Sequence, residues 1–289
     1  NDGNISLSFR KKMAKKIFKL TYNYDKMIYN WFEGTNFKAT KKNKVKLRYG
    51  ENPHQKSFFI KTNQSKSLYD GFIHGKQLSY NNLKDIETAF ECVNEFKKPT
   101  CVIIKHGSPC GVSTHSNIKK AFINSKKTDP ISAFGGIVAI NRVLNEDFAK
   151  LISKNYYEII IAPNFNKKSL ELLKIKKNLI LIQTKNIKKH LKSEIHSVSN
   201  GLLVQEKNNI YFDKIHMTRA SKYKGSIKNI EDLIFAFKVC KYVKSNAIVL
   251  ANNETTLAIG GGQTSRIDSV KIAINKLKKD MGFVAASDA

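Results

Sequence analysis

The chain has 289 residues, 41% of them hydrophobic, and a formal net charge of +28 at pH 7. The apolar content suffices for a substantial core, and no apolar run approaches the roughly 20 residues of a membrane span, so we expect no membrane partner. The charge suggests nucleic acid binding. Only five of the 51 basic residues are arginine, however, and arginine is the side chain best suited to phosphate and base recognition, so we expect no specific nucleic acid partner.

The first predicted element is a helix over residues 8–32, where apolar residues recur at helical spacing. Residues 34–45 are polar, lysine-rich and without periodicity, which is typical of a linker. From Val45 onward, short apolar runs alternate with amphipathic stretches, which predicts an α/β domain with a largely covered sheet. Further helices are expected at 82–97, 145–153, 167–174, 229–243 and 268–279, and strands at 57–61, 101–104, 136–140, 158–162, 179–183, 202–205, 246–251 and 256–260. The sequence shows no internal repeat strong enough to identify.

The first motif that could carry chemistry is LRYGENPHQ at residues 47–55. Its glycine and proline mark turns, so Arg48, Tyr49 and His54 are expected on one tight loop. An arginine and a histidine clustered on a loop can bind an anion. The alternative is a surface turn with an ordinary salt bridge.

The second motif is CVIIKHGSPCG at residues 101–111. An apolar strand delivers Lys105 and His106 at its carboxyl end, and a Gly-Pro turn is expected to follow. Ligands gather beyond the carboxyl ends of strands in α/β sheets, and a histidine there can act as a general base near neutral pH. The alternative is a strand-end histidine that is bonded to the backbone.

Two further motifs each present one candidate side chain. DPISAFGGIVAIN at residues 129–141 places Phe134 beside two glycines, as a platform for a flat ligand or as ordinary core packing. YEIIIAPNF at residues 157–165 begins a strand with Glu158, a position at which a carboxylate is more often solvated than catalytic.

The last motif spans residues 243–269 and is expected to form two strands, a Gly-rich loop and a helix. Its three glycines, Gly260–Gly262, permit close approach of a ligand to the backbone. Arg266 lies between the glycines and the next helix, whose N-terminus favours negative charge. The pattern matches neither a dinucleotide-binding nor a Walker loop, and it indicates a site for an anion or a carboxamide.

The four cysteines predict no metal site. They form no C-x-x-C pair, and their irregular spacing in a large chain is typical of a reduced, cytoplasmic protein with buried thiols. Pro109-Cys110 matches half of a zinc-deaminase signature, but Ser113 stands at the second cysteine position and no H-x-E precedes it. We therefore expect no catalytic metal.

The motifs LRYGENPHQ, KHGSPCG, DPISAFGG and SNAIV…GGGQTSR occur in this order along residues 46–289. Together they resemble the AICAR transformylase domain of the bifunctional purine-biosynthesis enzymes, and residues 81–91 and the closing GFVAASDA are similar to segments of the same family. Residues 1–33 resemble the last helix of the IMP cyclohydrolase domain, joined by the linker at 34–45.

The resemblance implies a fold and a reaction. Residues 46–200 would form the first, and residues 201–289 the incomplete second, of two cytidine-deaminase-like α/β halves without zinc, in a homodimer with active sites at the interface. The reaction would transfer the formyl group of 10-formyltetrahydrofolate to the 5-amino group of AICAR, giving formyl-AICAR and tetrahydrofolate in purine biosynthesis. IMP cyclohydrolase activity would belong to a full-length chain only.

The resemblance also implies roles for single residues. His106 would be the catalytic base, and Lys105 would assist it and help to hold the nucleotide. Arg48 and Tyr49 would contact the phosphate and ribose of AICAR, Asn246 and Arg266 would hold its carboxamide, and Phe134 would pack against the folate. His54 and Glu158 would be neighbours without an assigned role, since the family more often has aspartate at the position of Glu158.

Two departures from the family bear on activity. The upstream cyclohydrolase domain is missing apart from its tail, and so is the segment that follows Ser-Asp-Ala, so full activity is not expected of residues 1–289. A binding protein that keeps the fold without catalysis is one alternative. A nucleic acid binding module is another, and a salt titration would separate it, because nonspecific attraction disappears at moderate salt.

Overall fold

The structure is a computed structural model that describes residues 5–32, 44–61, 66–185, 187, 193–208, 217–222, 225–277 and 282–288. Its contacts divide the chain into two compact units, Asn1–Lys46 with Phe58–Thr62, and Leu47–Ser57 with Asn63–Ala289. The first unit contains α1 (Leu7–Phe32) and an antiparallel pair of β1 (Lys44–Lys46) and β2 (Phe58–Ile60). Helix α1 confirms the first predicted helix, and most of the predicted linker lies outside the described residues. None of the described helices combines the length and apolar character needed to cross a membrane.

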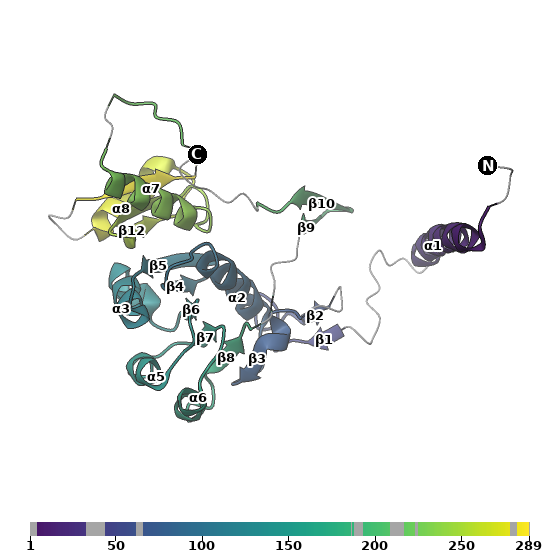
Figure 1. Ribbon diagram of the computed structural model, residues 1–289, viewed down its shortest axis with the longest axis horizontal. Helices are drawn as coiled ribbons and strands as arrows, with labels where there is room; N and C mark the ends of the chain where they lie inside the picture. Colours follow the sequence, from purple (N-terminus) through teal and green to yellow (C-terminus); the bar gives the residue numbers. More distant parts are fainter. Residues whose placement is uncertain are drawn as a thin grey trace. The chain divides into compact units, whose positions relative to one another are not determined.

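The second unit is built on a nine-stranded mixed sheet with the order β13-β11-β12-β5-β4-β6-β7-β8-β3 (Figure 1). Strands β6, β7 and β8 run parallel, and every other neighbouring pair is antiparallel. The strands are β3 (Phe72–His74), β4 (Thr100–Lys105), β5 (Ser108–Thr114), β6 (Ile137–Ile140), β7 (Ile159–Ala162), β8 (Ile180–Gln183), β11 (Ile248–Asn252), β12 (Thr255–Gly260) and β13 (Val284–Ser287). A separate hairpin, β9 (Ser193–Val198) and β10 (Gly201–Glu206), spans the predicted boundary at residue 200, which stays a prediction.

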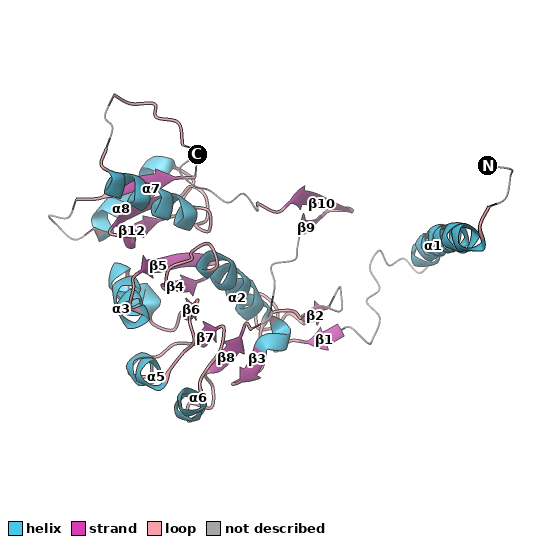
Figure 2. Ribbon diagram, in the orientation of Figure 1, coloured by secondary structure: helices cyan, strands magenta, loops and turns pink. Residues whose placement is uncertain are grey.

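Helices cover both faces of the central strands. Helix α2 (Tyr80–Val93) lies on one face, and α3 (Ile118–Thr128), α5 (Glu146–Ile152) and α6 (Lys167–Lys174) lie on the other (Figure 2). Along β4, Cys101 and Ile103 join the core with Phe122 and Phe148, whose rings meet edge to face with centroids 5.4 Å apart. Val102 and Ile104 are also fully buried, so the strand is apolar on both sides. This explains why β4 appears in the sequence as a continuous apolar run.

The helices of the second unit begin at N-caps that the sequence supplies. In six of them the N-cap side chain accepts a backbone N–H of the first turn, and these caps are Ser79, Asn117, Asp129, Asn145, Asn166 and Ser226. The capped helices include α4 (Pro130–Ala133) and α7 (Ile227–Cys240), whereas Ser265, before α8 (Arg266–Lys276), makes no side-chain cap. Helices α2, α5, α6, α7 and α8 confirm predictions to within a few residues, whereas α3, α4, β1, β3, β5 and β9 were not predicted.

Residues 79–128 and 226–276 share one α–β–β–α design that the sequence does not reveal. The first comprises α2, β4, β5 and α3, and the second comprises α7, β11, β12 and α8 (Figure 1). Each begins with a capping box in which the N-cap serine, Ser79 or Ser226, exchanges hydrogen bonds with an asparagine three residues later. We call these segments the first and the second repeat.

The two repeats join where β12 lies beside β5. The strands pair in register at Thr255 and Ser113, and the N–H of Thr114 donates to a carbonyl in the turn before β12 (2.8 Å). The hydroxyl of Thr256, which is 1% exposed, accepts from the N–H of Val112 (2.9 Å) and lies 3.0 Å from its carbonyl oxygen. A buried threonine therefore replaces part of the usual main-chain ladder at this junction.

Candidate functional site

The predicted site residues gather at one end of the strands. Strand β4 ends at Lys105, where β6 and then β7 begin, because Ile104 pairs with Ile137 and Ile137 with Ile159. By the same pairing, β12 ends and β11 begins at this end of the sheet, which we call the site end. Lys105 and His106 lie at the carboxyl end of β4, as expected, although β4 is antiparallel to β6 and carboxyl and amino ends of strands alternate at this end of the sheet.

A two-residue hairpin turn, rather than the expected Gly-Pro turn, presents the candidate base. Lys105 pairs with Ser108 across the turn, and His106 and Gly107 between them have φ angles of 53° and 74°. Positive φ at both central residues is the type I′ pattern, which matches the twist of the flanking strands. The proline of the motif lies inside β5, opposite Ile104, where the register of the hairpin shifts. His106 is exposed at the tip of this hairpin.

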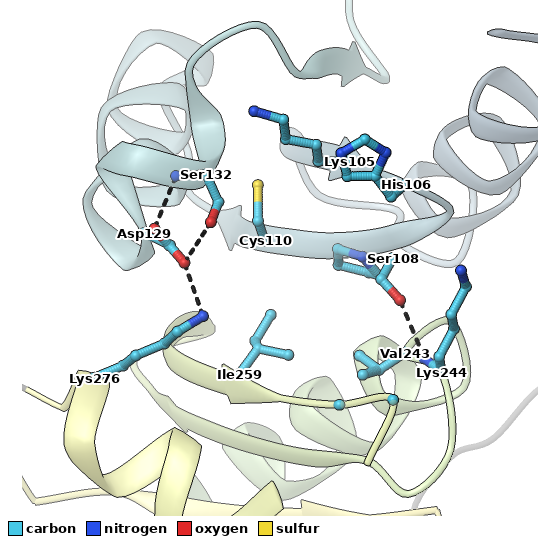
Figure 3. A pocket seen from close by; sticks show the side chains of 13 residues that line it. Lys105, His106, Ser108, Cys110, Asp129, Ser132, Val243, Lys244, Ile259 and Lys276 are labelled. Atoms are coloured by element: carbon cyan, nitrogen blue, oxygen red, sulfur yellow. Dashed lines mark hydrogen bonds and ion pairs between the residues drawn. The ribbon is translucent and has the colours of Figure 1, made fainter. Parts of the chain in front are cut away.

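A cavity of about 310 Å³ lies beside this turn, between the first and second repeats (Figure 3). Polar side chains from both repeats and from the start of α4 line it, and these are Lys105, His106, Ser108, Asp129, Ser132, Lys244 and Lys276. The backbone N–H of Lys244 donates to the Ser108 hydroxyl (3.1 Å), and the Lys276 ammonium pairs with the Asp129 carboxylate (2.9 Å). Three lysines against one carboxylate make the cavity attractive to an anion.

Asp129 anchors one wall of the cavity. Burial opposes ionisation of its carboxyl, but hydrogen bonds from Ser132 and Lys276 outweigh that effect and lower its pKa. Cys110 also lines the cavity, and burial raises the pKa of its thiol to about 12. A thiol that is protonated at neutral pH is a poor nucleophile, so the chemistry of this cavity falls to the lysines and the histidine.

Lys105 links the hairpin to the neighbouring motif. Its ammonium donates to the carbonyl oxygen of Phe134 (2.7 Å). The Phe134 ring is 63% exposed and packs against Tyr156, with ring centroids 5.4 Å apart. Core packing, the alternative reading of this residue, was therefore wrong, and the ring is available to a flat ligand.

A second cluster of predicted residues surrounds Glu158. Its carboxylate pairs with Lys76 (2.8 Å) and lies 3.7 Å from the guanidinium of Arg48. That guanidinium lies over the Tyr49 ring, 4.7 Å from its centroid, and donates to the Tyr49 hydroxyl (3.1 Å). Within the described residues, the buried Nε of Arg48 has no hydrogen-bond partner. A buried donor without a partner is costly, and an anionic ligand would satisfy it. His54 is exposed in the same loop.

Asn246 and Arg266 form a third cluster, which does not line the cavity. The Asn246 amide donates to the carbonyl oxygens of Gln263 (2.9 Å) and Thr264 (3.2 Å). The Arg266 guanidinium pairs closely with the Asp288 carboxylate, and hydrogen bonds from Ser245 and Arg266 lower the pKa of that carboxyl. Both predicted substrate residues therefore hold the segments around β11, β13 and the Gly-rich loop together.

The glycines of that loop also serve the protein's own packing, while Gly261 and Gly262 line the cavity and their role in ligand approach stays a prediction. A Cβ on Gly260 would lie 2.0 Å from the carbonyl oxygen of Ser269 in α8, and one on Gly261 would lie 2.3 Å from the Val243 side chain. Gly262 has a φ of +71°, which favours glycine. Close packing against α8 and Val243 therefore requires glycine at positions 260 and 261.

Among the described residues, no group of three or more His, Cys, Asp or Glu side chains is arranged to hold a metal ion.

The sheet, with a histidine-bearing turn and a cationic cavity at one end, is typical of α/β enzymes that bind anionic substrates. A family model described as the AICARFT/IMPCHase bienzyme matches residues 1–276. The chain is 41% identical to the bifunctional purine biosynthesis protein PurH of Fusobacterium nucleatum subsp. nucleatum over 99% of its length, and 42% identical to those of Caldicellulosiruptor bescii and Buchnera aphidicola subsp. Schizaphis graminum over its whole length.

The chain therefore belongs to the AICARFT/IMPCHase bienzyme family, whose members are enzymes of purine biosynthesis. It covers 58%, 59% and 60% of these three relatives, respectively, and so spans about three fifths of their length.

Proposed function

We propose that this protein transfers the formyl group of 10-formyltetrahydrofolate to the 5-amino group of AICAR, with His106 as the general base. The observation that carries the proposal is the exposed His106 turn beside a lysine-lined cavity, in a chain of this family. The amine of AICAR is a weak nucleophile, because its lone pair is delocalised into the ring and the carboxamide. A base that removes its proton as the N–C bond forms, together with positioning of both substrates, would supply much of the rate.

The other predicted residues take supporting roles in this proposal. Arg48, with its buried unpartnered Nε, would bind the phosphate of AICAR beside Tyr49. Lys105 would hold the nucleotide, and the exposed Phe134 ring would pack against the folate. Asn246 and Arg266 would orient the carboxamide. The cyclohydrolase activity in the family's name would belong to sequence other than residues 46–289, and the paired repeats support the proposal of two deaminase-like halves.

The geometry of the sheet supports the proposal of a homodimer. Arg48 contacts Glu158 at the start of β7, and Arg266 contacts Ser287 at the end of β13. Six strand spacings separate β7 from β13, roughly 29 Å along the sheet at about 4.8 Å each. Two arginines of one chain at this separation cannot grip one small substrate, so we propose that Arg266 of a second copy completes the site that Arg48 and His106 begin.

Mixing two inactive variants tests both the reaction and the shared site. We expect the His106→Asn and Arg266→Gln variants, each made in the whole natural chain and purified separately, to lose formyl transfer. Co-refolding them in equal amounts should restore about a quarter of wild-type turnover, because half of the dimers are mixed and each mixed dimer holds one intact site. The measurement is the rate of tetrahydrofolate formation.

Two outcomes would contradict this picture in different ways. If mixed samples stay inactive although both variants pair, then His106 and Arg266 act in the same chain. If the wild-type protein binds AICAR but transfers no formyl group, then the fold serves binding alone and the proposed reaction is wrong.

A further inference from the structure

Each repeat places an aspartate of its first helix beside its hairpin turn. In the second repeat the Asp232 carboxylate accepts the backbone N–H groups of Asn253 (3.0 Å) and Glu254 (2.6 Å) at the turn between β11 and β12. In the first repeat the Asp85 carboxylate lies beside the matching turn, with its Oδ1 3.8 Å from the position that a Cβ on Gly107 would take. Each aspartate is the sixth residue after its N-cap serine and precedes the first turn residue by 21 positions.

These turns need such support because both of their residues have positive φ. The second repeat has Asn253 and Glu254 at φ 51° and 47°, and the first has His106 and Gly107 at 53° and 74°. Asparagine tolerates the left-handed region, whereas most other side chains pay about 1–2 kcal/mol there. A histidine stands in the first repeat where the second has an asparagine, so this turn carries local strain at its functional residue.

The surroundings of the two aspartates differ in charge. Asp232 is 3% exposed and binds backbone N–H groups. Asp85 is half-buried and also faces two titratable groups, the imidazole of His106 and the carboxylate of Glu158. Burial and Glu158 raise the pKa of Asp85, while the backbone hydrogen bonds and His106 act in the opposite direction. Asp85 therefore lies beside the backbone of the turn and interacts electrostatically with the imidazole of the candidate base.

We propose that Asp85 is the positioning residue of His106: its carboxylate fixes the strained turn so that the imidazole stays beside Lys105 at the cavity. This inference rests on the proposed role of His106 in formyl transfer. A general base is effective only when a further group fixes its orientation. Asp85 supplies that group through the main chain, from a helix that belongs to the same repeat.

The chain provides a matched control, because Asp232 occupies the matching position beside the turn of a repeat without the candidate base. We expect Asp85→Ala to lower kcat by about 10- to 100-fold, within the range attributed to general bases, while the KM for AICAR changes by less than about 3-fold. Asp85→Asn keeps one oxygen acceptor and should fall between Asp85→Ala and the wild type. Asp232→Ala should lower the melting temperature at least as much, with kcat per folded molecule within about 2-fold of wild type.

A spectroscopic readout separates positioning from stability. The protein has seven histidines, so the ring signal of His106 can be assigned in ¹³C-histidine-labelled protein through its loss in His106→Asn. We expect this signal to move in both Asp85 variants and to stay in place in Asp232→Asn and Asp232→Ala. If Asp85→Ala fails to fold, Asp85→Asn gives the same comparison.

Equal kcat in the Asp85 and Asp232 variants, or an unmoved His106 signal in Asp85→Asn, would overturn the positioning role. A wild-type protein that transfers no formyl group would count against the proposed function instead. The ring signal would then still decide whether Asp85 holds the histidine.

Discussion

The His106→Asn variant should lose at least about 10²-fold in the kcat of formyl transfer, the usual scale for a general base, and should melt at the wild-type temperature or above it. The amide cannot accept the proton of the amine at neutral pH. It can, however, adopt the positive φ of 53° that the turn requires, as Asn253 does at the matching position of the second repeat. Steady-state rates and thermal melts of the purified variant measure both effects.

The reverse exchange is its control. Asn253→His should leave kcat unchanged and lower the melting temperature by roughly 2–4 °C, the shift that about 1 kcal/mol produces in a domain of this size. Near-wild-type turnover in His106→Asn would remove His106 from the reaction. A lower melting temperature in that variant would contradict the strain assigned to this turn.

Gly260→Ala should be among the most destabilising single-methyl additions in the chain. Its Cβ would lie 2.0 Å from the carbonyl oxygen of Ser269 and 2.9 Å from the carbonyl carbon, both of them backbone atoms of α8. Because a helix backbone cannot rotate away as a side chain does, we expect a loss of at least about 3 kcal/mol in the free energy of unfolding. Chemical denaturation monitored by circular dichroism measures it, and the melting temperature should fall by roughly 6–12 °C.

The chain offers a twin and a control for this experiment. Gly111→Ala in β5 should behave alike, because its Cβ would lie 1.9 Å from the carbonyl oxygen of Ser125 in α3. Gly282→Ala should be silent, since no heavy atom of the described residues lies within 4 Å of the added carbon. If Gly260→Ala unfolds like Gly282→Ala, then α8 does not pack on β12 as closely as the structure has it.

Much of the fold could be predicted from local pattern, and the failures have physical reasons. Strands β4 and β7 are apolar on both faces and therefore stand out as runs. Strand β5 was missed because glycine and proline were taken as breakers, although Pro109 lies in the hairpin where the register shifts. Helix α3 was missed because lysines dominate it, while the few side chains that it buries, among them Ala121 and Phe122, suffice to hold it on the sheet.

The candidate site could be predicted only where its residues are neighbours in sequence. Lys105 and His106 share one turn, and the structure places both beside the cavity. Lys76, Lys244 and Lys276 were not predicted, because strand pairing brings them to the site end from segments that are distant in sequence. The one available signal for Asp85 was its position within residues 81–91, a segment already noted for its resemblance to the family.

The junction between β12 and β5 has a consequence for how the protein opens. A sheet whose strands are all joined by main-chain hydrogen bonds unfolds as one cooperative unit. Between β12 and β5, in contrast, Thr255 pairs with Ser113 and the hydroxyl of Thr256 replaces a main-chain partner of Val112. Proteins open in separate cooperative units, and a junction with few main-chain hydrogen bonds is where two such units separate. Amide protons of β11 and β12 should therefore exchange with deuterium as one group, ahead of those in β4 and β6. The second repeat can then detach and return while the strand that carries His106 stays folded.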